Sequence, residues 1–520
     1  MTTITSDIVS RLWNLCNILK DDGVTYHQYV TELTYLLFLK MAKETGIEDQ
    51  LPEGQRWGDL ESKAAPDRLE FYKLLLIHLG SHGAPLVQEI FANASSFIRK
   101  PVTLSALVTE IDKLDWYSVH REDLGDLYEG LLEKNANEKK SGAGQYFTPR
   151  PLIETMVAVM KPDIADFIQD PAAGTGGFLI VANNYIRQHG HFDEWTEEQQ
   201  RKYRHRTFYG MEHVQDTHRL ALMNLMLHGL DSFEGGAGIH YGDTLGAEGE
   251  ALPKATLILT NPPFGTKKGG GLPSRTDFTF PTSNKQFCFL QHIYRGLMPG
   301  GRAAVVMPDN VLFESNVGTQ IRRDLMDKCN LHTILRLPTG IFYAQGVKTN
   351  VLFFTRGHSD KANTKEVWVY DLRANMPQFG KRTQLTREHF TGFEAFFGPD
   401  PHGGNSEYRH SLVDGIHWNL DRGASSSNND QHNDDAPHRH SRAGGNPETA
   451  RFRAFTREQI AERGDSLDIA WLKDDSADNH DDLPEPALLA QEAIDELQGA
   501  LLELQGILAE LGEAVDEVEV

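Results

Sequence analysis

The spacing of apolar residues changes along the chain, and the change separates two kinds of predicted structure. In the N-terminal part, apolar residues recur every three or four positions, which places them on one face of a helix. The positions with this spacing are Val30, Leu33, Leu37 and Met41, and further along Leu124, Leu127 and Leu131. We therefore expect residues 1–140 to form a helical N-terminal domain, with both stripes in its core.

From residue 141 to about 400, short apolar and β-branched runs alternate with helical segments. The runs lie at 164–169, 208–212, 255–260, 303–308 and 351–355. Runs of this length and composition predict buried strands. Strands that alternate with helices predict a mostly parallel sheet covered on both faces. We therefore expect a doubly wound, Rossmann-like α/β domain over residues 141–400.

The pattern breaks after this domain and then returns. Residues 401–450 include a Ser/Asn/Asp tract that cannot build a core, so we expect a flexible linker or insertion there. Further on, apolar residues alternate spacings of three and four at Ile494, Leu497, Leu501, Leu504, Leu508, Leu511, Val515 and Val518. This coiled-coil spacing predicts a helical C-terminal tail over residues 451–520 that docks on a partner. The alternative is an ordinary terminal helix packed on its own domain.

The run at 255–260 ends in a tetrapeptide that indicates the chemistry, Asn261, Pro262, Pro263 and Phe264. Each proline fixes φ and lacks an N–H, so the strand ends in a rigid elbow with few backbone donors. The Asn261 side-chain oxygen and the Pro262 carbonyl can accept the two hydrogens of one planar NH₂ group, with Phe264 as a stacking face. These acceptors favour methyl transfer to an exocyclic amine, because they push its delocalised lone pair towards a tetrahedral nucleophile. The alternative is a proline-rich strand exit without chemical function.

A second site is predicted where the run at 164–169 ends. Asp170 is followed by a glycine turn and then by a helix through Tyr185. The turn residues are Gly174, Thr175, Gly176 and Gly177. Strand, glycine turn and helix form the layout of a nucleotide-type site, in which the glycines let a ligand approach the backbone and Asp170 offers a carboxylate to an ammonium group.

Two further acids follow at expected strand ends. Glu212 is placed to accept both hydroxyls of a ribose, and Asp243 is placed to accept from an adenine NH₂ group. The turn is not a dinucleotide fingerprint, because it lacks the third glycine and Glu212 lies well beyond the ~20 residues expected for a dehydrogenase. We expect the charged residues at 189–206 to form a helical extension.

Taken together, these motifs resemble a known family. The turn, the acids and the elbow follow one another as in the S-adenosylmethionine-dependent N6-adenine DNA methyltransferases, and residues 144–153 resemble the modification subunit of Type I restriction–modification systems. The resemblance covers nearly the whole chain. It implies S-adenosylmethionine as cofactor and adenine N6 in a specific site of double-stranded DNA as acceptor, with the target adenine flipped out. It also implies a specificity subunit, a restriction subunit and a second copy of this chain as partners.

The resemblance assigns Asn261, Pro262, Pro263 and Phe264 to catalysis. Together with the acids above, it gives a cofactor pocket of Gln145, Tyr146, Phe147, Thr148, Pro149, Arg150, Asp170, Gly174, Thr175, Gly176, Gly177, Glu212 and Asp243. We expect no metal site, because the histidines at 432, 438 and 440 are not accompanied by cysteines or acids at a spacing typical of metal ligands. The sequences at 418–422 and 451–453 resemble family sequence that is normally closer together, so an insertion separates them.

Charge and composition qualify this assignment. Hydrophobic residues make up 39% and charged residues 24%, as in soluble globular proteins, but the formal net charge of −23 counts against unaided binding to phosphates. Lys267, Lys268 and Arg275 flank the elbow in a glycine-rich loop at 265–283, which either orders on DNA or is a plain disordered loop. We therefore expect the chain to reach DNA through its partner.

The location expected from the sequence is the cytoplasm. No run approaches the ~20 apolar residues of a membrane span, and the first residues lack the features of a signal peptide. Cys16, Cys288 and Cys329 have neither metal nor disulfide spacing, which is typical of free thiols in a reducing compartment.

Two alternative functions share the elbow. One is a methyltransferase acting on the glutamine side-chain amide of translation release factors, although those chains are shorter and usually have Tyr where Phe264 stands. The other is a catalytically silent scaffold subunit that has kept the fold.

Overall fold

The computed structural model describes residues 11, 15, 26–114, 116, 148–230, 237–265, 272–342, 348–377, 379, 383–404, 407–410 and 451–472. Within these ranges, no helix is both long and apolar enough to cross a bilayer.

Helices make up the N-terminal part, as the apolar spacing predicts. They are α3 (Tyr26–Thr45), η1 (Glu48–Gln50), α4 (Trp57–Ser62), α5 (Ala65–Leu79), α6 (Pro85–Ile90) and α7 (Pro101–Asp112). Proline stands in the first turn of α5, α6 and α7, where its missing N–H costs no helical hydrogen bond. Leu33, Leu37 and Met41 are buried as expected, but α3 is buried on every side from residue 32 to 42 rather than along one stripe. The side chain of Val30 and the stripe at 124–131 lie outside the described residues.

The rest of the described chain is built on a nine-stranded sheet with the order β3-β2-β1-β4-β5-β7-β6-β8-β9. The strands are β1 (Ile168–Asp170), β2 (Phe208–Glu212), β3 (Gly238–Tyr241), β4 (Ala255–Thr260), β5 (Leu297–Pro308), β6 (Cys329–Arg336), β7 (Thr349–Arg356), β8 (Glu366–Asp371) and β9 (Phe452–Thr456). Strands β1 to β5 pair with one another in parallel, and β7 runs antiparallel to β5 and β6. The expected doubly wound α/β fold is thus confirmed, and the strand order switches between β1 and β4.

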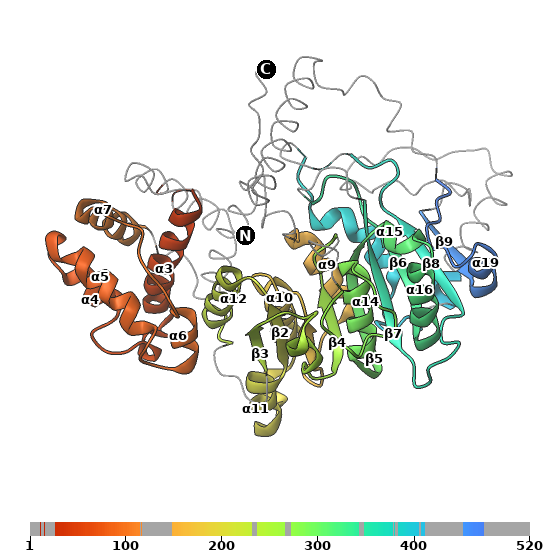
Figure 1. Cartoon of the computed structure of the whole chain (residues 1–520), viewed down its shortest axis with the longest axis horizontal. Coiled ribbons are helices and arrows are strands. Elements are labelled where there is room, and N and C mark those ends of the chain that lie inside the picture. The colour runs from red at the N-terminus through yellow and green to blue at the C-terminus, as the bar shows by residue number, and fades with distance from the viewer. Residues whose placement is uncertain are drawn as a thin grey trace, which may run out of the picture.

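Alternate side chains of the strands pack into two layers of helices. Leu257 and Leu259 of β4 face one core, and Ile258 faces the other. The first layer contains α9 (Arg150–Met160), α10 (Gly177–His189), α12 (Gln215–Leu227), η5 (Arg387–Phe390) and α17 (Thr391–Phe397), and its core is continuous with that of the N-terminal helices. The second contains α14 (Lys285–Gly296), α15 (Asn310–Phe313), α16 (Val317–Lys328) and α19 (Arg457–Glu462). Figure 1 shows the N-terminal helices beside α12, at the β3 end of the sheet.

Two expected elements have different bounds. Strand β1 begins four residues later than the run at 164–169, because the Asp166 carboxylate accepts from the Asp163 N–H (3.0 Å) and closes a turn before it. The helical extension at 189–206 is divided into the end of α10, η3 (Phe192–Glu194) and α11 (Glu197–Arg206). The division follows from Gly190 at the end of α10 and from Thr196, whose hydroxyl caps α11.

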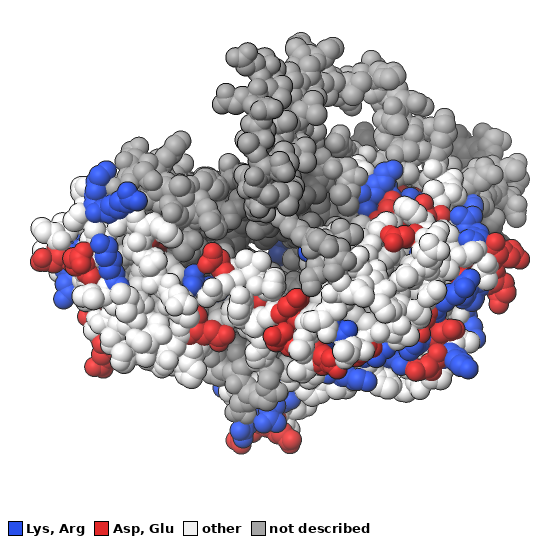
Figure 2. Space-filling view, in the orientation of Figure 1, with Lys and Arg blue, Asp and Glu red and all other residues white. Residues whose placement is uncertain are grey.

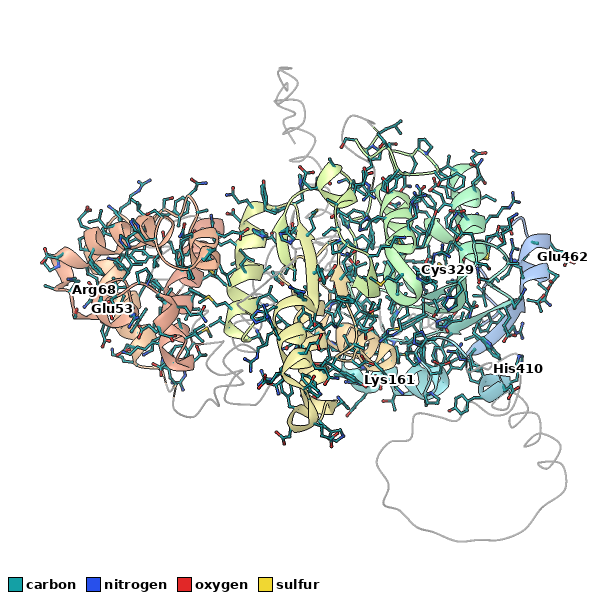
Figure 3. The ribbon with its side chains drawn as sticks, turned by 90° about the horizontal axis from the view of Figure 1, so that it is seen from below. Glu53, Arg68, Lys161, Cys329, His410 and Glu462 are labelled. Atoms are coloured by element: carbon teal, nitrogen blue, oxygen red, sulfur yellow. The ribbon has the colours of Figure 1, made fainter. Side chains whose placement is uncertain are left out.

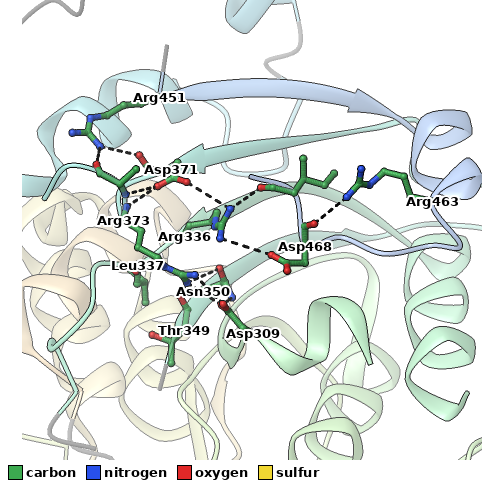
Figure 4. Close-up of polar contacts among 12 residues, drawn as sticks. Asp309, Arg336, Leu337, Thr349, Asn350, Asp371, Arg373, Arg451, Arg463 and Asp468 are labelled. Carbon is green, nitrogen blue, oxygen red and sulfur yellow. Dashed lines mark hydrogen bonds and ion pairs between the residues drawn. The ribbon is translucent and has the colours of Figure 1, made fainter. Parts of the chain in front are cut away.

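Residues 451–472 continue the sheet instead of beginning a helical tail, which corrects that expected boundary. β9 pairs antiparallel with β8 at the edge of the sheet. Figure 4 shows the polar contacts of this segment: Arg336 Nη1 donates to the Ile469 carbonyl (2.7 Å), and Arg451 Nη1 donates to the Asp371 carbonyl (3.1 Å). The sequence did not predict β9, because an edge strand of five residues shows little periodicity in its apolar positions. The predicted coiled-coil seam lies outside the described residues.

Two of the three cysteines lie in the described part of the chain. Cys288 and Cys329 are buried free thiols, as expected. Burial raises the pKa of the Cys329 thiol to about 12, so it stays protonated at neutral pH. Figure 3 shows Cys329 in the sheet half of the molecule, far from Glu53 and Arg68 in the N-terminal part.

Candidate active site

Three predicted site residues meet at one edge of the sheet. β2, β1 and β4 are parallel neighbours, and Asp170 pairs in register with Gly210 while Gln169 pairs with Ile258. The carboxyl ends of these strands therefore bring Asp170, Glu212 and Asn261 to the same side. This is the switch point of the sheet, where ligands of doubly wound folds bind.

The glycine turn after β1 has the backbone that its sequence predicts. Gly174 and Gly176 have φ angles of 56° and 85°, a left-handed region that residues with a Cβ rarely adopt. Gly176 caps α10, which begins at Gly177. The Thr175 carbonyl accepts from Asn224 Nδ2 of α12 (3.0 Å), so a neighbouring helix fixes the turn.

Glu212 is tied to this turn through its carboxylate. Its Oε2 accepts from the Gly174 N–H (2.9 Å), and its Oε1 accepts from the Val214 N–H (2.7 Å). Burial raises the pKa of Glu212, and the backbone N–H groups partly offset the rise. A carboxylate has about four acceptor positions, so these two bonds leave room for a pair of ligand hydroxyls.

Asp170 is buried at the end of β1, and its carboxylate accepts from the Ala172 N–H (3.1 Å). Burial raises its pKa to about 7; the Thr260 hydroxyl and the Ala172 N–H lower it, and Glu212 raises it further. Among the described residues, no Lys, Arg or His forms a salt bridge with Asp170 or Glu212. The pair of acids therefore has the character of a site for a cationic ligand.

The elbow after β4 is held from two sides. Asn261 is buried, and its Nδ2 donates to the Thr148 hydroxyl (2.9 Å), which fixes the rotation of the amide. After Phe264, the Gly265 N–H donates to Gln286 Oε1 of α14 (3.0 Å). Phe264 is partly buried against the core of the first helical layer. The elbow thus has the rigidity that its prolines predict.

The segment before β1 is only partly described. Gln145, Tyr146 and Phe147 lie outside the described residues. Thr148 contacts the elbow through Asn261, and Pro149 caps α9. The Arg150 side chain pairs with Glu154 one helical turn on (3.3 Å). The described end of the segment therefore contacts the elbow, a relation that the sequence did not show.

Asp243 lies two residues beyond β3, at the sheet edge shared with Glu212. Its carboxylate accepts from the Leu245 N–H (2.9 Å) and shapes the loop before α13 (Ala247–Glu250). The next residue, Thr244, donates through its hydroxyl to the Pro171 carbonyl (2.5 Å) and so ties this loop to the glycine turn.

Three residues with a place in the site were not predicted. Asn224 and Thr244 hold the backbone of the turn, and Val214 is an exposed apolar side chain next to Glu212. The position of Val214 two residues after the acid could have indicated an apolar contact for a ligand. Asn224 and Thr244 gave no local indication, because their partners lie 49 and 73 residues away.

Arg275 is not available to a phosphate group, which corrects its expected part in DNA contact. It forms a salt bridge with Asp277 (2.6 Å) and donates to the Thr244 carbonyl (3.1 Å), with its side chain nearly buried. Lys267 and Lys268 lie outside the described residues. In the view of Figure 2, Lys and Arg side chains are interspersed with Asp and Glu over the described surface. The described part of the chain also contains no cluster of three metal-binding side chains.

Comparison with known proteins gives a consistent result. A family model for the N-6 DNA methylases matches residues 119–414. The methylase subunit of the Type I restriction enzyme StySJI from Salmonella typhimurium is 52% identical, over 99% of this chain and 97% of its own length. The methylase subunit of the enzyme EcoKI from Escherichia coli is also 52% identical over the same shares.

Solved structures extend the likeness to the fold. The crystal structure of the EcoKI M protein is 48% identical, with a TM-score of 0.54 over 99% of this chain and 98% of that chain. A chain from a type I R-M system, solved to explain complex assembly and conformational transition, is 26% identical. Its TM-score is 0.66 over 98% of this chain and 99% of that chain.

Proposed function

This chain belongs to the methylase subunits of Type I restriction enzymes, and from that premise we propose that it transfers a methyl group from S-adenosylmethionine to adenine N6 in DNA. It acts as the modification subunit of a complex in which another subunit selects the site. The observation that carries the proposal is the placement of the Asn261 elbow beside the turn of Asp170 and Glu212, on adjacent strands. A methyl donor and an amine acceptor must meet at such a junction.

The charge of the turn supports this cofactor. Asp170 and Glu212 form no salt bridge with a basic residue in the described part of the chain, and both have raised pKa values, with burial as the main cause. S-adenosylmethionine carries an ammonium and a sulfonium group and supplies an electrophilic methyl group when it is bound. In our proposal Asp170 holds the ammonium end, and Glu212 accepts from the ribose hydroxyls beside the Gly174 N–H.

The elbow acts on the adenine. The Asn261 amide oxygen and the Pro262 carbonyl accept the two hydrogens of the N6 amine, and Phe264 stacks on the base. The Thr148 hydroxyl holds the Asn261 amide through Nδ2 (2.9 Å), so no reorganisation is needed when the amine attacks. As the N–C bond formed, the methyl–sulfur bond of the donor would break and leave a neutral thioether, and the amine would lose one proton to solvent. Taking the base out of the duplex costs a few kcal/mol, which stacking and pairing at the elbow partly offset.

The pocket wall that we propose includes the residues of the segment before β1. Gln145, Tyr146, Phe147, Thr148, Pro149 and Arg150 line it together with Gly174, Thr175, Gly176, Gly177 and Asp243, while Pro263 stiffens the elbow. Two copies of this chain would join the specificity subunit, and a restriction subunit would complete the nuclease, in the cytoplasm. The net charge of −23 and the buried state of Arg275 support DNA binding through that assembly rather than by this chain alone.

The test is methyl transfer by the complete methylase. The chain and its specificity subunit, with S-adenosylmethionine labelled in the methyl group, should produce N6-methyladenine in duplex DNA, identified by mass spectrometry of the nucleosides. Asn261→Ala should abolish transfer and keep cofactor affinity, because it removes an acceptor used only on the reacting amine. Asn363→Ala is the matched control, since Asn363 bonds the Asp327 and Ser359 carbonyls and has no part in the proposed site.

The same assay separates the alternatives. Transfer to a glutamine-containing release-factor peptide but not to DNA would support the protein methyltransferase. Cofactor binding without transfer to either acceptor would support the silent scaffold. Equal methylation rates for the parent and Asn261→Ala would remove the elbow from the mechanism.

A further inference from the structure

Helix α12 lies between the N-terminal helices and the cofactor turn. It packs against α3 and α6 on one side and against β2 and β3 on the other. All but one of its residues from His218 to Leu227 are buried. Figure 1 shows the helix in this position, between α6 and the sheet. Because α12 is closely packed on both sides, a displacement of the N-terminal helices should move the helix as a whole and so reach β2 and β3, and the reverse should also hold.

Arg219 fastens α12 to the N-terminal helices. Its Nε donates to the Ile90 carbonyl and its Nη2 donates to the Ala92 carbonyl, each at 2.9 Å. These carbonyls stand at the C-terminal end of α6, where peptide groups lack helical partners and carry partial negative charge. The guanidinium also lies 5.6 Å from the centre of the Tyr35 ring of α3. One buried side chain therefore contacts both N-terminal helices that face α12.

The same helix holds the proposed cofactor site. Asn224 Nδ2 donates to the Thr175 carbonyl (3.0 Å), and the Val214 N–H at the start of the helix donates to Glu212 Oε1 (2.7 Å). Arg219 and Asn224 are five positions apart, which turns their side chains about 140° from each other around the helix axis, with about 7.5 Å between them along it. The two residues therefore anchor opposite faces of one rigid element.

We propose that Arg219 is a positioning residue and that α12 couples cofactor binding to the docking of the N-terminal helices. Binding at the turn fixes Thr175 and Glu212, and with them the helix, which strengthens the hold of Arg219 on the end of α6. By thermodynamic linkage, loosening that hold weakens cofactor binding by the same factor. The inference rests on the proposed cofactor and adds a role for a region that does not touch it.

Amide hydrogen exchange of the full-length chain tests the coupling. The probe is S-adenosylhomocysteine, and its binding is measured separately by calorimetry. Addition of the probe should slow exchange at residues 86–98 about five-fold or more, the lower end of typical allosteric coupling. Arg219→Ala should abolish this protection and raise the dissociation constant by a similar factor. Arg219→Lys keeps the charge but cannot reach both carbonyls, so its effect should be intermediate.

The matched control is Arg204→Ala, which removes an exposed arginine of α11 with no bonding partner among the described residues. It should keep both the protection and the affinity of the parent. The measurement on the parent decides the question even if Arg219→Ala fails to fold. If the parent binds the probe and residues 86–98 exchange at an unchanged rate, the coupling is overturned and the proposed cofactor stands. If the parent does not bind the probe, the proposed cofactor falls, and the coupling falls with it.

Discussion

Asp170→Asn should stabilise the free protein while it destroys the cofactor site. The carboxyl is buried and its pKa is about 7, so the folded state holds a proton that the unfolded chain loses above the ordinary value of 3.8. The folded state is therefore penalised increasingly as the pH rises from 3.8 to about 7. Asn has nearly the same shape, keeps an oxygen for the Ala172 N–H and carries no charge, so it removes this penalty.

The size of the effect follows from the two pKa values. At 1.36 kcal/mol per pKa unit, the penalty in the parent is about 4 kcal/mol at pH 8 and about 2 kcal/mol at pH 5. The stabilisation by Asp170→Asn should accordingly be larger at pH 8 than at pH 5. Urea denaturation of the free protein at both pH values measures it. Calorimetry with S-adenosylhomocysteine should show lost binding in the variant, and in the parent an affinity that falls as the pH drops below about 7.

Asp166→Asn is the matched control. It makes the same substitution four residues away, but its expected effect on the free energy of unfolding has the opposite sign. Asp166 is also buried, but it accepts from Arg302 Nη1 and Nη2 at 3.0 and 2.8 Å. Although burial acts to raise its pKa, these bonds hold it below the usual range. The control should lose about 3–5 kcal/mol of stability, because the buried Arg302 guanidinium loses its counter-charge. If Asp170→Asn were equally destabilising at pH 5 and pH 8, the burial of an uncompensated charge would be refuted.

Three further predictions concern the site and the tail. Thr148→Val should slow methyl transfer about ten-fold, because Asn261 loses the bond that orients it; a loss of cofactor affinity at an unchanged rate would limit Thr148 to the pocket wall and remove its role in orienting Asn261. Glu212→Ala should weaken S-adenosylhomocysteine binding about 100-fold, measured by calorimetry, and an unchanged affinity would remove Glu212 from the pocket. Deleting residues 485–520 should keep cofactor binding but lose stable association with the specificity subunit in size-exclusion chromatography, and an undiminished complex would place the seam within this chain.

The elements that could be predicted from the sequence are those whose information is local. The run at 255–260 is apolar because β4 is buried on both faces, and the prolines after it fix the elbow whatever surrounds them. The turn with Gly174 and Gly176 could be predicted for the same reason, since a left-handed backbone demands glycine where it occurs. Parallel strands then bring these local features to one edge without further information.

The features that escaped prediction depend on distant partners. Thr148 and Asn261 are 113 residues apart, and nothing near Thr148 marks it as the support of an amide. A loop arginine is usually exposed, so the sequence predicts a surface cation at Arg275, but its bonds to Asp277 and to the Thr244 carbonyl hold the side chain away from solvent. The partners of a charged side chain are set by the fold and not by its neighbours in the sequence. The ion pair of Arg275 with Asp277 and the bonds of Arg219 to the end of α6 could therefore be found only in the structure.

Because β9 lies at the edge of the sheet, the length of chain that precedes this strand should have little effect on the stability of the sheet. Within the sheet β9 pairs only with β8, and the hydrogen bonds of Arg336 and Arg451 hold the segment at residues 451–472 in place. The closure entropy of a connection grows slowly with its length, by about 0.6 kcal/mol for each doubling, so a longer stretch of chain between residues 411 and 450 should have little effect on the sheet. A gene can therefore acquire foreign sequence at this point without losing the enzyme, and the join becomes a natural place to attach a reporter domain.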